Sequence, residues 1–163
     1  MVAARRLSEF VQQKVLLAVM VLYASSLPWS VCYFENRHET YPGYMCLFLT
    51  PIALLGGYWE AGANVVLVLW SAAVNQAKCA EDDESRLTWQ ITGVLLSGLA
   101  VYLALVFLGR ETLLIDEAGN EGTITRVGPG FYFWVSSMTA AFAGSVLWIV
   151  VGRFGFGAAE GQR

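Results

Sequence analysis

Long apolar runs without charge dominate the chain. Residues 15–34, 88–109 and 131–152 are each 20–22 residues long and contain no Asp, Glu, Lys or Arg. At about 1.5 Å per residue, each run gives a helix about 30–33 Å long, which matches the hydrocarbon core of a bilayer. A soluble domain of this size does not bury three such helices on every side. The pattern therefore predicts an integral membrane protein, in keeping with the mean hydropathy of +0.54.

The first run resembles the core of a signal peptide, because Arg5, Arg6 and Lys14 precede it. It continues to residue 34, however, and is longer than such a core normally is. We therefore interpret residues 15–34 as a retained membrane span.

A further apolar stretch, residues 43–74, contains Glu60 and, close to it, glycines 56, 57 and 62. It crosses the membrane either twice, or once with residues 44–55 lying on or dipping into its surface. A single crossing places seven Lys and Arg residues on the side of the termini and three on the other side, whereas two crossings place five on each. Cytoplasmic loops carry the excess of Lys and Arg, so the single crossing is favoured. Both termini are then cytoplasmic, in a bacterial inner membrane.

Residues 110–130 form the longest connection outside the predicted spans. Segments 112–116 and 123–127 have strand-like composition, and the turn residues between them predict a β-hairpin. The predicted fold is an all-α integral membrane protein with one membrane domain over residues 1–163. It has four transmembrane helices, a short re-entrant or interfacial helix before the second, and a small extracytoplasmic β-hairpin between the third and fourth. The predicted spans are residues 15–34, 57–76, 88–109 and 131–152, with the short helix at 44–55.

Glu60 and Asn64 are the candidate polar site. A carboxylate at membrane depth is costly, and residues four apart on a helix face the same way. One interpretation is an ion or proton pathway, or a site for a polar ligand. The alternatives are a carboxylate near the outer interface, or one that pairs with Asn64 or a tyrosine inside the bundle.

Cys32 and Cys46 both fall on the outer side of the predicted topology, where they form either a disulfide or two unpaired buried thiols. No Cys-x-x-Cys pair supports thiol catalysis. His38 is the only histidine, which is too few ligands for a metal site. We therefore predict no catalytic residues, no metal and no cofactor. The acidic residues 81–84 are interpreted as a solvated turn.

Small residues at every fourth position allow helices to approach closely. They occur in two predicted spans, where they pack either within the protein's own bundle or against a second membrane protein or another copy of the chain. These candidate interaction faces are Gly93 and Ser97, and Ser137, Ala141 and Ser145.

The net charge of −3 and the lack of a basic stripe argue against nucleic acid as a partner. The function expected from these features is that of a non-catalytic inner-membrane protein that binds other proteins, such as an accessory subunit or an immunity-type protein. Its partners are then the lipid bilayer and another membrane protein or itself. One alternative is an oligomeric transporter or channel that uses Glu60, and another is a membrane thiol-disulfide protein that uses Cys32 and Cys46.

Overall fold

The computed structural model describes residues 2–35, 40–114 and 121–160. The chain is mostly helical and carries a small antiparallel sheet. The α-helices are α1 (Val2–Ser26), α2 (Gly43–Leu55), α3 (Gly62–Cys79), α4 (Asp83–Val106) and α5 (Pro129–Glu160). A short 3-10 helix, η1 (Trp59–Ala61), precedes α3, and a second one, η2 (Phe107–Gly109), follows α4. The strands are β1 (Ser30–Phe34), β2 (Thr40–Pro42), β3 (Thr112–Leu114) and β4 (Glu121–Val127).

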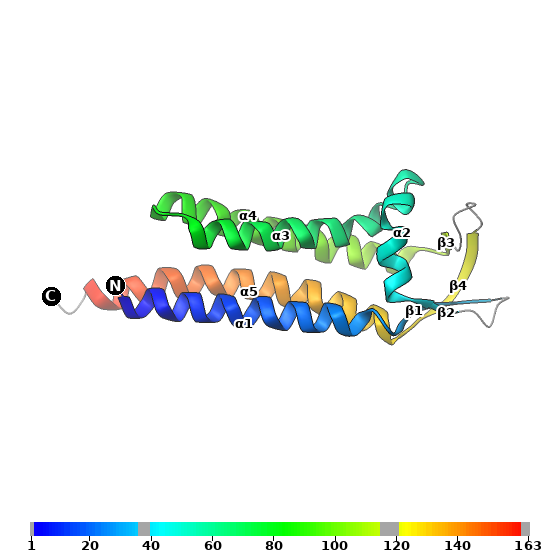
Figure 1. Ribbon diagram of the computed structural model, residues 1–163, viewed down its shortest axis with the longest axis horizontal. Coiled ribbons are helices and arrows are strands. Elements are labelled where there is room, and N and C mark those ends of the chain that lie inside the picture. The colour runs from blue at the N-terminus through cyan, green and yellow to red at the C-terminus, as the bar shows by residue number, and fades with distance from the viewer. Residues whose placement is uncertain (1, 36–39, 115–120, 161–163) are drawn as a thin grey trace.

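The four long helices form two pairs that run side by side (Figure 1). Helix α1 packs along α5, α3 packs along α4, and contacts between α4 and α5 join the two pairs. Helix α2 lies across one end of the bundle, next to the sheet, and both termini lie at the opposite end (Figure 1). The sheet end is called the outer end below, after the predicted topology.

Two segments are long and apolar enough to cross a membrane, Asp83–Gly109 and Pro129–Val151. They correspond to the third and fourth predicted spans. Helix α1 ends at Ser26 and strand β1 begins at Ser30, so the last eight residues of the first predicted span, 15–34, are not helical. Aromatic and β-branched residues after Ser26 favour a strand as much as a continued helix.

The acidic residues 81–84 start helix α4. The side chain of Asp82 accepts a 2.6 Å hydrogen bond from the backbone nitrogen of Ser85, which caps the helix. Asp83 and Glu84 then lie in its first turn, where negative charge is favourable. This turn therefore has a structural role as a helix start.

The sheet has the strand order β2-β1-β4-β3, with every neighbouring pair antiparallel. The predicted hairpin between the third and fourth spans is confirmed as β3 and β4, which pair with Thr112 opposite Thr123. Strands β1 and β2 were not predicted. Because β1 pairs with β4, the connection after α1 and the connection before α5 share one sheet.

Close backbone approach at Gly128 and Gly130 fixes this sheet to the bundle. A Cβ atom at Gly128 would lie 2.2 Å from the carbonyl oxygen of Ser30, and one at Gly130 would lie 2.5 Å from that of Trp29. The Gly128 nitrogen donates a 2.7 Å hydrogen bond to the Val31 oxygen. Glycine is therefore required where the start of α5 meets the start of β1.

Candidate functional site

Glu60 lies where the chain turns from α2 into α3. Helix α2 ends at Leu55, and Gly57 adopts a positive φ of 85°, a conformation that side chains disfavour. The short helix η1 follows and carries Glu60, whose side chain is only 2% exposed. The turn at Gly57 therefore leads into the segment that carries this buried carboxylate.

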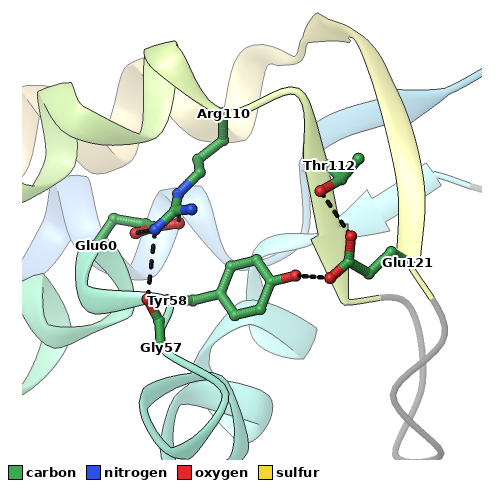
Figure 2. A network of polar contacts seen from close by, with 6 residues as sticks. All are labelled: Gly57, Tyr58, Glu60, Arg110, Thr112 and Glu121. Atoms are coloured by element: carbon green, nitrogen blue, oxygen red, sulfur yellow. Dashed lines mark hydrogen bonds and ion pairs between the residues drawn. The ribbon is translucent and has the colours of Figure 1, made fainter.

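Arg110, directly after η2, neutralises this carboxylate (Figure 2). Its Nη2 atom donates a 3.0 Å hydrogen bond to Oε2 of Glu60, and its Nε atom lies 2.7 Å from Oε1. The second contact is poorly aligned for hydrogen bonding, so charge attraction holds it. Nη2 also contacts the Gly57 oxygen at 3.4 Å, and the guanidinium lies 5.2 Å from the ring centre of Tyr58. The interpretation from the sequence in which Glu60 pairs with Asn64 or a tyrosine did not include this arginine.

Tyr58 connects the same cluster to the sheet (Figure 2). Its hydroxyl donates a 2.5 Å hydrogen bond to Glu121 at the start of β4, and Thr112 of β3 donates to the other carboxylate oxygen at 2.8 Å. These two hydrogen bonds lower the pKa of Glu121. The hydrogen bond to Glu121, together with burial, raises the pKa of Tyr58. Glu60, Arg110, Tyr58, Glu121 and Thr112 are called the cap cluster below.

Asn64 joins four helices through its side chain. Its Oδ1 accepts hydrogen bonds from the hydroxyl of Tyr23 in α1, at 3.1 Å, and from the indole of Trp134 in α5, at 2.9 Å. Its Nδ2 donates to the hydroxyl of Thr50 in α2 at 3.0 Å. Glu60 and Asn64 therefore serve separate networks, although both line the same cavity.

This cavity lies beneath α2 at the outer end, has a volume of about 60 Å³ and is partly open to the surroundings. This volume is well below the range of about 300–1,000 Å³ of typical small-molecule sites, which have mostly apolar walls and a few polar groups. The walls here have that character. They include Leu49 and Ala53 of α2, Phe107 of η2, and the polar side chains of Tyr23, Glu60 and Asn64.

Cys32 and Cys46 are both free, so the structure does not support the predicted disulfide. Cys32 is fully buried in β1, and burial raises the pKa of its thiol to about 12. A thiol that stays protonated is a poor nucleophile. The expected alternative of two unpaired thiols describes this arrangement.

The small residues of the candidate interaction faces are buried between the protein's own helices. The Trp70 indole of α3 donates a 2.8 Å hydrogen bond to the hydroxyl of Ser145 in α5, and a Cβ at Gly93 would lie 3.8 Å from the Trp70 ring. Ser97, Ser137 and Ala141 are fully buried as well. These positions are therefore used within the bundle and do not form an open surface.

The structure groups no three His, Cys, Asp or Glu residues in a metal-binding arrangement among the residues it describes. His38 lies outside the described residues.

Sequence reasoning found Glu60 and Asn64 but missed their partners. Arg110 carried a usable signal, because it is the first cation after the third predicted span and lies on the same side as Glu60 in the predicted topology. Tyr23 and Trp134 carried none, since aromatic residues near span ends are common in membrane proteins.

Comparisons with protein-family models, curated proteins and solved structures found no match for this chain.

Proposed function

We propose that the chain is a four-span membrane protein that acts without catalysis, by presenting its outer end to another protein. The two long apolar helices support the membrane assignment. So do large apolar side chains on the outer faces of the remaining helices, including Leu17 and Met20 of α1 and Val68 and Leu69 of α3, each at least half exposed. Exposed apolar surface of this extent is typical of proteins that meet lipid or a partner.

The distribution of charge supports the proposed orientation. Arg5, Arg6 and Lys14 belong to α1 near the end that holds both termini, while Lys78 and Arg86 flank the turn between α3 and α4. Arg110 and Arg126 belong to the sheet end. An excess of cations on one side favours cytoplasmic termini and an extracytoplasmic sheet, in a bacterial inner membrane.

One row of the sheet supports a protein-binding role. Tyr33 of β1 pairs across the strands with Thr40 of β2 on one side and Arg126 of β4 on the other. The guanidinium of Arg126 stacks 4.2 Å from the ring centre of Tyr33. Tyr33 is partly exposed, and Thr40 and Arg126 are exposed. Tyrosine and arginine are the residues most enriched at energetically important contact points. Held in place by stacking, they lose little freedom when a partner binds.

The cap cluster makes this row part of a fixed platform. It ties β3 and β4 to η1 and to the end of α4 through charge-assisted hydrogen bonds. The same ion pair supports a structural role for Glu60, so transport through this carboxylate stays a prediction from the sequence. The single observation that carries our proposal is the Tyr33–Arg126 row.

Copurification in mild detergent tests the protein-binding role. We expect Arg126→Gln and Tyr33→Ala to reduce recovery of a specific partner about tenfold each, because each removes a contact worth about 1–2 kcal/mol. Lys78→Gln is the matched control, since it removes a cation at the opposite end. Equal recovery with all three variants would refute the proposal.

Thiol labelling in whole cells tests the orientation independently. Cys79 is exposed at the end of α3 and is expected to react only with a membrane-permeant maleimide. Thr123→Cys, at an exposed position in β4, is expected to react with the impermeant reagent as well. Reaction of Cys79 with the impermeant reagent in intact cells would contradict the orientation.

A further inference from the structure

We propose that helix α2 lies in the outer leaflet of the bilayer, where its exposed face contacts phospholipid acyl chains just beneath the headgroups. This face consists of Phe48, Ile52 and Leu55 and is called the lipid face below. The inference rests on the four-span membrane placement proposed above, but it concerns a separate surface and makes no use of the Tyr33–Arg126 row. The composition of α2, the length of α3 and the bonding at the ends of α2 support it.

Helix α2 is apolar on its exposed side. Thr50 and Ala53 are buried against the rest of the protein. On the opposite side of the helix, Phe48 is 75% exposed and Leu55 is 91% exposed. No Asp, Glu, Lys or Arg occurs in residues 40–59. A helix at the surface of a soluble domain carries polar residues on its exposed face, so α2 requires a second apolar environment on this side.

The shortness of α3 explains why apolar surface is needed at this place. The apolar part of α3, residues 62–74, is about 20 Å long at about 1.5 Å per residue, whereas the hydrocarbon core of a bilayer is about 30 Å thick. Asn75, Gln76 and Lys78 follow it. In the part of the chain that the structure describes, the two segments long and apolar enough to cross a membrane do not include α3. Helix α3 therefore leaves about 10 Å of the core uncovered.

Helix α2 supplies the missing thickness at the outer end. It lies across this end of the bundle (Figure 1) and contacts the first turn of α3. A Cβ at Gly62 would lie 3.6 Å from the Leu54 side chain, and Asn64 donates a 3.0 Å hydrogen bond to Thr50. An α-helix with its side chains is about 10–12 Å wide, which matches the thickness that α3 leaves uncovered. Lying crosswise, α2 completes the apolar cover of the second span.

Backbone groups at both ends of α2 are bonded within the protein, as a hydrocarbon environment requires. Four amides at or beside these ends donate to carbonyl oxygens of the chain, namely those of Gly43, Tyr44, Gly57 and Tyr58. At the start of α2 the acceptors are Trp29 and Leu27, at 3.0 and 3.1 Å. At its end, the positive φ of Gly57 turns the chain back, and the acceptors are Leu54 and Ala53, at 3.2 and 2.9 Å. Carbonyl groups that a helix end otherwise leaves to water are thereby satisfied.

Exposed aromatic side chains mark the outer boundary of the membrane at the same level. Trp29 follows α1, Trp59 follows α2 and Tyr132 lies in the first turn of α5, and each is more than half exposed. Tryptophan and tyrosine concentrate where the hydrocarbon core meets the headgroups. Because α2 begins with a hydrogen bond to the backbone of Trp29 and ends just before Trp59, its whole length lies near this boundary.

Spin labelling of the full chain in phospholipid vesicles tests this proposal. A nitroxide is attached to Phe48→Cys or to Leu55→Cys in a chain that also carries Cys79→Ser, because Cys79 is an exposed native thiol. Collisions of the nitroxide with oxygen, which concentrates in hydrocarbon, are compared with collisions with a water-soluble nickel chelate. We expect the oxygen-to-nickel ratio to exceed that of a label at Thr123→Cys by about tenfold, because a polar chelate is excluded from hydrocarbon.

Two reference positions separate this proposal from the membrane placement on which it rests. Thr123 is exposed in β4, and Leu95 is 68% exposed in α4 and serves as the lipid reference. A high ratio at Leu95 with a ratio at α2 equal to that at Thr123 would overturn the lipid face and leave the four-span placement standing. A low ratio at Leu95 as well would overturn both. Few collisions with either reagent at α2 would mean that another protein or a second copy covers this face, which would also overturn the proposal. Leu55→Cys, at the more exposed position, keeps the test valid if Phe48→Cys lowers the thermal midpoint.

Discussion

The outer end and the middle of the bundle bury polar side chains for different purposes. In the middle, Trp70 and Ser145 bond directly across α3 and α5 beside Gly93, and the adjoining cavity has a volume of only about 10 Å³. At the outer end, Asn64 and the cap cluster bond around a cavity of about 60 Å³. Small residues in the middle let the helices close together, whereas larger polar networks at the outer end hold elements apart.

This difference indicates which contacts fix the position of the elements in each region. Close packing in the middle makes the helix pairing depend on shape, so few side chains fit there. At the outer end the positions of α2 and the sheet depend on a small number of hydrogen bonds and one ion pair. Breaking those contacts is therefore expected to have larger and more local consequences than breaking a polar contact in the middle.

The largest effect is expected at the ion pair of the cap cluster. Arg110→Ala leaves the Glu60 carboxylate buried without its cation, which we expect to lower the free energy of unfolding by about 3 kcal/mol, discounted for the partial exposure of Arg110. Denaturant unfolding in detergent micelles measures it. Arg86→Ala, which loses an ion pair with the exposed Asp83 and a hydrogen bond to the Ala80 oxygen, is the control and should cost about 1 kcal/mol.

A second substitution distinguishes charge burial from general damage to the cap. Adding Glu60→Gln to Arg110→Ala removes the uncompensated charge and is expected to recover part of the lost stability. A double variant less stable than Arg110→Ala would show that Glu60 has another essential partner.

The next effect is expected at Asn64. Asn64→Leu leaves Tyr23, Trp134 and Thr50 without their shared partner, and we expect a loss of about 2 kcal/mol in the free energy of unfolding. Asn75→Leu, at an exposed position of the same helix, serves as the control and should have little effect. Similar losses in the two variants would mean that α3 tolerates Leu poorly in general.

A smaller effect is expected in the middle of the bundle. Ser145→Ala removes the acceptor of the Trp70 indole, and we expect a loss of about 1 kcal/mol because one neutral hydrogen bond is broken. Ser71→Ala, which removes an exposed hydroxyl from α3, is the control. A loss larger than that of Asn64→Leu would reverse the comparison between the two regions.

The smallest effect concerns pH at the cap cluster. The lowered pKa of Glu121 gives stability that is present above its unfolded pKa of about 4.3 and is lost as the pH falls through the lower folded value. The raised pKa of Tyr58 gives stability that is present below about pH 10 and is lost as the pH rises through the higher folded value. Glu121→Gln is expected to reduce the fall of the thermal unfolding midpoint at acid pH. If the midpoint falls equally in the variant and the parent, this carboxylate is not the source of the acid sensitivity.

The sequence predicted the helical class, the β3–β4 hairpin and the short helix before α3, because each leaves a local signal in composition or spacing. It did not predict β1 and β2. Val31 and Phe34 are as apolar as a span requires, so their strand character follows from pairing with β4, which lies far away in the sequence. The partners of Glu60 and Asn64 were hidden for the same reason, since Arg110 and Trp134 reach them only after the helices have packed.

The pairing of β1 with β4 imposes an order on biosynthesis. Tyr33 accepts a hydrogen bond from Thr125, and 92 positions separate the two residues. At about 5–20 residues per second, β1 waits about 5–20 s for its neighbour. During that interval its free edge exposes unpaired backbone groups, which attract strands from other chains. Glu60 likewise waits for Arg110. A nascent chain stalled between α4 and β4 would therefore be an early target for aggregation or for a chaperone that covers strand edges.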